Sequence, residues 1–178
     1  MEGFEIDACL DSFCIKIDSR EQPSERARKR YAAFGVPYSV QTLNYGDYTY
    51  NFKLPSGEWL FNDTDTISGH CVIERKMSLT ELSGNLCQNR KRFKEEFRRA
   101  KENNASVYLL VEDASWEALL NGRYNTKFNP NAYFGSICSF MARYNIQLIF
   151  CKKELSGKLI KEILYRELKT RLETGFYG

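Results

Sequence analysis

The sequence has only one histidine, His70, among its 178 residues. Mechanisms that depend on a histidine base held by a hydrogen-bonding partner are therefore disfavoured. No apolar run approaches the roughly 20 residues that a membrane-spanning helix requires. The first residues also lack the basic and apolar regions of a secretory signal. We accordingly expect an intracellular protein without membrane contact, in the cytoplasm or nucleoid, or in the nucleus if its source is eukaryotic or a virus of eukaryotes.

Closely spaced cysteine pairs and nucleotide-binding loops are also missing. The six cysteines form no CxxC pair, which disfavours a zinc site, and we expect buried or idle thiols in a reducing compartment. Without a GxxxxGK[ST] loop or a dinucleotide fingerprint, a nucleotide-dependent phosphotransfer enzyme is disfavoured. The net charge of +3 is too small to indicate nucleic acid binding, so the distribution of charge matters more.

What the chain does have is an apolar fraction of 43% and an aromatic fraction of 14%, typical of a folded globular protein. Strand-like and helix-like segments alternate, which predicts an α/β domain with helices on both sides of a mixed sheet. We expect one domain over residues 1–178, with a core over residues 13–151. Strands are predicted at residues 13–18, 36–43, 71–76, 106–113 and 146–151, with a hairpin from residues 47–53 and 58–63. Helices are predicted at residues 23–34, 89–103, 115–121, 130–144 and about 156–172.

The strand CVIERK, residues 71–76, carries the residues best suited to chemistry. Side chains alternate along a strand, so Glu74 and Lys76 share one face and Arg75 takes the other. A carboxylate can hold Mg²⁺ while a neighbouring ammonium orients water or offsets negative charge on a phosphate. The same spacing is also common at solvated strand ends and in simple ion pairs.

One carboxylate is not enough, because hard cations take several oxygen ligands. The best second ligand is Asp47, which follows Gly46 at a turn where glycine permits a tight bend. Asp18 and Glu21 come just after the first predicted strand. We expect these acids to converge with Glu74 on one site, although a Gly-Asp pair can equally be plain turn chemistry.

In this order, the motifs resemble those of the XPF/Mus family of structure-specific nucleases. Residues 18–21, DSRE, are similar to the Asp-x-Arg-Glu of the family, and residues 46–48 resemble its GDY turn. Residues 74–76 match its ERK signature. RFKEE at residues 92–96, followed by an apolar strand, resembles its arginine-rich helix. The resemblance covers roughly residues 13–151.

The resemblance implies a three-layer restriction-endonuclease-like fold and an Mg²⁺-dependent endonuclease, with Mn²⁺ able to substitute. The implied substrate is branched DNA such as a fork, flap or junction, in repair or recombination. Asp47 and Glu74 would bind the metal, and Asp18 and Glu21 would complete or support the metal site. Lys76 would position the attacking water.

Arg75 would help to build the site. The sequence departs from the family pattern four residues after the lysine, where Thr80, followed by Glu81, replaces an aspartate. This departure motivates an alternative function, a catalytically weak or inactive relative that binds DNA or scaffolds a partner. We see no segment long enough for the helix-hairpin-helix domain of many members, and expect a homodimer or a partner that supplies DNA binding.

The predicted helix over residues 89–103 is strongly basic. Its apolar stripe of Phe93, Phe97 and Ala100 lies beside a cationic face, which could follow a phosphate backbone or simply be solvated. That face contains Arg90, Lys91, Lys94, Arg98 and Lys101. We expect DNA contacts from Arg20, Arg90, Lys91, Arg92, Lys94 and Arg98.

Overall fold

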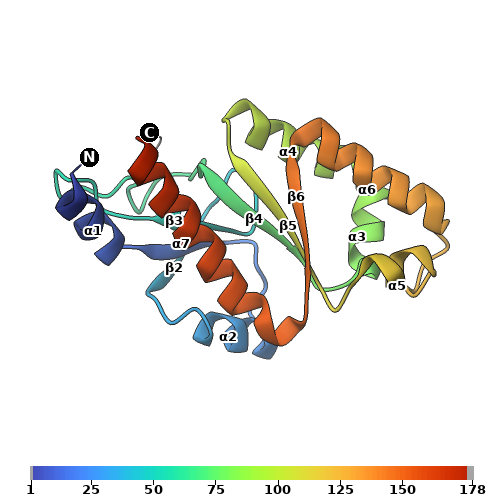
Figure 1. Ribbon diagram of the computed structural model, residues 1–178. Coiled ribbons are helices and arrows are strands. Elements are labelled where there is room, and N and C mark those ends of the chain that lie inside the picture. Colours follow the sequence, from blue (N-terminus) through green and yellow to red (C-terminus); the bar gives the residue numbers. More distant parts are fainter. Residues whose placement is uncertain (1, 176–178) are drawn as a thin grey trace.

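A mixed sheet forms the middle layer of the protein, as shown by a computed structural model that describes residues 2–175 (Figure 1). The sheet has six strands in the order β2-β1-β3-β4-β5-β6. The strand β3 runs antiparallel to both its neighbours, and all other neighbouring pairs are parallel. The strands are β1 Cys14–Asp18, β2 Tyr38–Gln41, β3 Tyr48–Asn51, β4 Cys71–Lys76, β5 Ser106–Glu112 and β6 Ile146–Cys151.

Helices cover both faces of this sheet, which confirms the predicted three-layer α/β fold. One layer contains α1 Gly3–Asp11, α2 Glu25–Ala32 and α7 Ser156–Thr174. The other contains α3 Leu79–Leu86, α4 Arg90–Glu102, α5 Trp116–Leu120 and α6 Pro130–Tyr144. A short 3₁₀ turn, Lys153–Leu155, leads into α7. None of the helices within residues 2–175 combines the length and the apolarity of a membrane span.

Helix boundaries follow the capping residues of the sequence. The Ser24 side chain accepts a hydrogen bond from the backbone of Ala27, so α2 begins after Pro23 rather than at it. Asn129 caps α6, whose first residue is Pro130. The helix α3, which has no counterpart among the predicted helices, begins at the Ser78 cap. The helix α1 also has none, because it buries only Cys9 and shows little periodicity.

The predicted hairpin is wrong in its second half. Residues 47–53 do include β3, but residues 58–63 form no strand, and their backbone is paired with the first half through one isolated bridge, between Lys53 and Trp59. Both edges of β3 are already paired, with β1 and β4, so no edge is left for a hairpin partner. The Asn51 side chain instead binds the backbone of Phe61.

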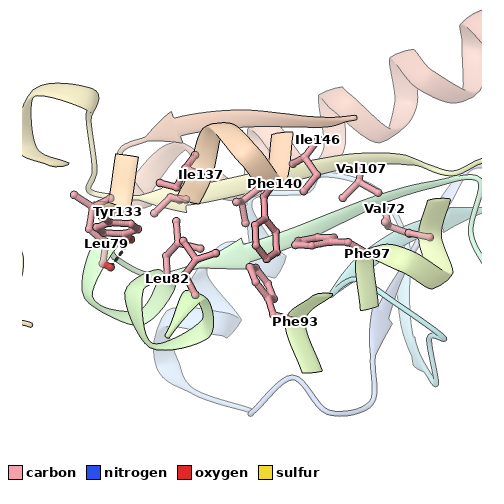
Figure 2. Packing of buried hydrophobic residues seen from close by; sticks show 14 of the residues in the cluster. Val72, Leu79, Leu82, Phe93, Phe97, Val107, Tyr133, Ile137, Phe140 and Ile146 are labelled. Atoms are coloured by element: carbon pink, nitrogen blue, oxygen red, sulfur yellow. Dashed lines mark hydrogen bonds between the residues drawn. The ribbon is translucent and has the colours of Figure 1, made fainter. Parts of the chain in front are cut away.

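The core beneath α3, α4 and α6 is aromatic (Figure 2). The rings of Phe93 and Phe97 on α4 lie 4.5 Å apart, and Phe140 of α6 packs against both. Tyr133 donates a hydrogen bond from its hydroxyl to the Leu79 carbonyl, 2.7 Å away. These contacts anchor α4 along its apolar side and leave its polar side facing the ends of β3 and β4.

The core on the opposite face is built around α7. Ile160, Leu164, Leu168 and Leu172 recur every four residues and are all buried. Each such side chain contributes about 1.5–3 kcal/mol when fully buried. The apolar face formed by these four residues therefore packs inside this chain.

Candidate active site

A polar cavity of about 210 Å³ lies between β4 and α4. A water molecule occupies about 30 Å³ in the liquid, so the cavity has room for a hydrated cation or a phosphate group. Its walls come from the end of β1, the turn before β3, the strand β4 and the helices α3 and α4. The lining residues are Asp18, Arg20, Asp47, Glu74, Lys76, Asn85, Asn89, Arg92, Phe93 and Glu96.

The strand β4 contributes an ion pair between Glu74 and Lys76 to this cavity. Both side chains are buried, and the ammonium of Lys76 lies 5.4 Å from the centre of the Phe93 ring. Burial lowers the pKa of Lys76, but the charges of Glu74 and Asp47 outweigh it and leave the pKa above its ordinary value. Lys76 is therefore a fixed positive charge at neutral pH.

Asp47 reaches the cavity from a turn that only glycine fits. Gly46 has a φ of 74°, and a Cβ there would lie 2.8 Å from the Cβ of Val72. The Asp47 amide donates to the Ile73 carbonyl at 2.8 Å, and its Oδ2 accepts from the amide of Arg75 at 2.7 Å. These bonds dock the turn on β4 and hold Asp47 beside Glu74.

Both carboxylates have raised pKa values in the cation-free protein. Burial, and then the charge of Glu74, raises the pKa of Asp47 to about 8, although Lys76 opposes the shift. Burial also raises the pKa of Glu74, with a further contribution from the charge of Glu96. Glu74 is only 4% exposed, and no partner for its Oε2 occurs within residues 2–175.

This donor set fits a divalent cation that retains water. Among residues 2–175, no three acidic, histidine or cysteine side chains converge closely enough for a closed metal site. Mg²⁺ does not need one, because it is usually held by one or two carboxylates together with waters and substrate phosphates. The free oxygen of Glu74 and the neighbouring Asp47 match that requirement.

Asp18 lines the cavity, but both its oxygens are already engaged. Oδ1 accepts from the Leu43 amide at 3.0 Å, and Oδ2 accepts from Nε of Arg20 at 2.5 Å. Arg20 also donates to the Leu43 carbonyl. Asp18 thus fixes the loop after β1 and holds Arg20 beside the cavity.

Glu21, by contrast, lies outside the cavity lining. It belongs to a buried charge network on the opposite face of β4, where its Oε1 is 2.6 Å from Arg30 and 3.3 Å from Arg75. Arg75 also lies 3.2 Å from Glu112, which pairs with Arg26 as well. The strand alternation thus places Arg75 opposite Glu74 and Lys76, and Glu21 supports the site through Arg75.

The predicted DNA-binding cations have different surroundings in the structure. Arg92 lines the cavity and is exposed, as is Lys91. Arg90 donates to the Leu86 carbonyl and lies over the Phe140 ring. Arg98 pairs with two glutamates of its own helix, and Lys94 is half-buried. Arg20 and Arg92 are the two cations of this set that reach the cavity.

Three lining residues were missed by the sequence reading, namely Asn85, Asn89 and Glu96. Arg92 and Glu96 are four residues apart within α4, a spacing that places helical side chains on a common face and is a usable signal. Asn85 lies on α3 and Asn89 directly precedes α4, so no helical spacing in the sequence links these two residues.

The chain shows similarity to known proteins at both the sequence and the structure level. The ERCC4 domain family matches residues 17–163. A structure of XPF from Aeropyrum pernix superposes with a TM-score of 0.59 at 18% identity, covering 86% of this chain and 61% of that one. The same protein in complex with DNA gives a TM-score of 0.59 at 20% identity, covering 88% and 65%. This chain thus spans under two thirds of these relatives, and no curated protein gives a sequence match.

Proposed function

The chain belongs to the ERCC4 domain family, and from that premise we propose that its cavity is the active centre of a divalent-cation-dependent DNA endonuclease. The observation that carries the proposal is the buried set of Asp47, Glu74 and Lys76, with the Oε2 of Glu74 left unpartnered. Asp47 and Glu74 share one fixed ammonium, so the site can take a further positive charge. This arrangement suits a site that binds a cation and a phosphate together.

Asp47 and Glu74 would hold the cation, Mg²⁺ or Mn²⁺. When bound, such an ion supplies positive charge and lowers the pKa of a coordinated water. Asp47 would have to release its proton first, because its pKa in the cation-free protein is about 8. Lys76 stays protonated, so it would orient the attacking water and offset charge on the phosphate rather than accept a proton.

DNA would approach along the cavity face of α4. Arg92 and Arg20 can neutralise phosphates beside the carboxylates, and the amides of Asn85 and Asn89 can donate to phosphate oxygens. The XPF relative that was solved in complex with DNA supports this choice of substrate. We expect branched DNA to be cut, in repair or recombination inside the cell, with a second copy or a partner protein extending the contact.

The test is cleavage of fork, flap and Holliday-junction DNA with Mg²⁺ by the wild type, Asp47→Asn and Glu74→Gln. Each substitution is expected to lower kcat by roughly 10²- to 10³-fold, the loss typical for one electrostatic group in an active site. Glu173→Gln on α7 is the control, because Glu173 lies on the far layer, where it pairs with Lys169. Undiminished cleavage by both variants would refute the assignment.

A second candidate is a DNA-binding or partner-scaffolding module without hydrolysis. It is favoured by Thr80 in the sequence and by the absence of a three-ligand cluster in residues 2–175. A module of this kind should bind junction DNA equally well with Mg²⁺ and with EDTA, and should cut none of the panel. Sedimentation with and without DNA would show whether a second copy joins.

A further inference from the structure

Glu96 lies on α4, across the cavity from Asp47 in the turn before β3 and from Glu74 on β4. Its Oε1 accepts a hydrogen bond at 3.1 Å from the amide of Gly46, the residue directly before Asp47. Glu96 therefore lines the same cavity as both proposed cation ligands, although it is far from them in sequence.

The second oxygen of Glu96 is free for a ligand. No hydrogen bond or ion pair to its Oε2 occurs within the described part of the chain, and the side chain is only partly buried. This differs from the other glutamates of α4. Glu95 and Glu102 are both engaged by Arg98 on the outer surface of the helix.

Thr80 and Glu81, which follow Lys76 in sequence, do not lie beside Glu74 in the cavity lining. The Thr80 hydroxyl accepts from the Asn125 amide at 3.0 Å, and the Glu81 carboxylate accepts from the Met77 amide at 2.7 Å. Neither residue lines the cavity. Thr80 and Glu81 therefore supply no carboxylate to the cavity.

A separate observation concerns the second oxygen of Glu74, which Lys76 does not engage. The Oε2 of Glu74, in a side chain only 4% exposed, has no hydrogen-bond partner among residues 2–175. A buried carboxylate oxygen without a partner costs free energy, which a bound cation would recover. Glu96 and Glu74 line opposite walls of the same space.

We propose that Glu96 supplies the third carboxylate of the cation site, and that the ion draws Asp47, Glu74 and Glu96 together on binding, because no three acidic side chains within residues 2–175 already converge in the cation-free structure. This inference rests on the proposed function and extends it, because it takes one ligand from α4, the same helix that presents Arg92 to DNA. The helix α4 would then contact the cation through Glu96 and the DNA phosphate through Arg92. Glu96 would replace the acid that the chain lacks at Thr80.

The experiment is calorimetric titration of the intact protein with Mn²⁺, without DNA, on the wild type, Asp47→Asn and three glutamate variants. Glu96→Gln keeps an oxygen that can accept from the Gly46 amide but removes the charge. We expect it to weaken Mn²⁺ binding by at least tenfold. Glu96→Asp, which keeps the charge on a shorter side chain, should bind more tightly than Glu96→Gln. Glu102→Gln on the same helix is the matched control and should bind as the wild type does.

The outcomes separate this inference from the proposed function. If the wild type binds Mn²⁺, Asp47→Asn abolishes binding and Glu96→Gln leaves it unchanged, Glu96 only holds the turn and the inference is overturned while the proposed function stands. If the wild type binds no Mn²⁺, both are overturned. Circular dichroism of each variant in EDTA provides the check on folding, and Glu96→Asp decides the matter if Glu96→Gln does not fold.

Discussion

The two faces of β4 carry two kinds of buried charge. On one face Arg75 joins a network in which Glu112 and Glu21 are each contacted by arginines. On the other face Glu74 shares a single lysine with Asp47. In the network facing the α2 side three arginines surround Glu21 and Glu112, whereas the cavity facing α4 has more carboxylates than cations within reach.

This difference gives one face of β4 a structural role and leaves the other face able to bind a ligand. The Oε1 of Glu112 accepts no hydrogen bond but lies 3.6 Å from Arg30, so its charge is already matched by the arginines around it. The Oε2 of Glu74 also has no partner within residues 2–175, and the one lysine beside it is shared with Asp47, so Glu74 can take a further cation, at a cost to the stability of the cation-free protein. The backbone amide of Arg75 links the two faces, because it donates to Asp47 while its guanidinium lies in the network.

The largest effect on stability is expected on the face of β4 that carries the arginine network. Glu112→Gln removes the charge of a side chain that is 0% exposed and leaves the surrounding arginines unmatched. Removing one partner of a buried ion pair typically costs about 3–5 kcal/mol. Urea unfolding in EDTA should show a loss of this size. A loss under about 1 kcal/mol would mean that the two faces do not differ in the way described.

The opposite sign is expected on the cavity face. In the cation-free protein the raised pKa of Asp47, about 8, means that the folded state binds a proton more tightly than the unfolded state does. That contribution to stability is complete below the unfolded pKa of about 4, and it is lost as the pH rises through about 8. The free energy of unfolding in EDTA should therefore fall between these values.

Asp47→Asn removes this titration and flattens the profile. At pH 9 the variant should be more stable than the wild type by about 1 kcal/mol or more, since each unit of pKa shift corresponds to about 1.4 kcal/mol. Urea unfolding across the pH range measures both curves, with Glu173→Gln as the control. A wild-type curve that rises with pH would contradict the raised pKa.

The smallest effect concerns the surface of α4, where charges are again either free or matched. Arg92→Ala should weaken the binding of junction DNA several-fold in EDTA and lower the salt dependence by about one phosphate contact. Arg98→Ala should change affinity by less than about twofold, because Glu95 and Glu102 already neutralise Arg98. Fluorescence anisotropy over a salt series compares them. Equal losses would indicate that Arg98 leaves its glutamates for DNA.

Local patterns were sufficient for much of the fold and for the part of the site on β4. Alternation along CVIERK placed Glu74 and Lys76 together and Arg75 apart, and the φ of 74° at Gly46 agrees with the glycine turn expected before Asp47. The failed hairpin shows the limit of such patterns. A strand-like composition at residues 58–63 could not reveal that both edges of β3 were taken.

The sequence by itself determined the alternation of strands and helices, the buried stripe of α7 and the identity of the ERK strand, because these depend on periodicities of two and of about four residues along the chain. Only the tertiary structure decided which acids share the cavity. It directed Glu21 to Arg30 and Arg75, engaged both oxygens of Asp18, and brought Glu96 from α4 to the turn at Gly46. Such encounters depend on how α4 packs through Phe93 and Phe97 against α6 and the sheet, and no pattern of neighbouring residues encodes that distance.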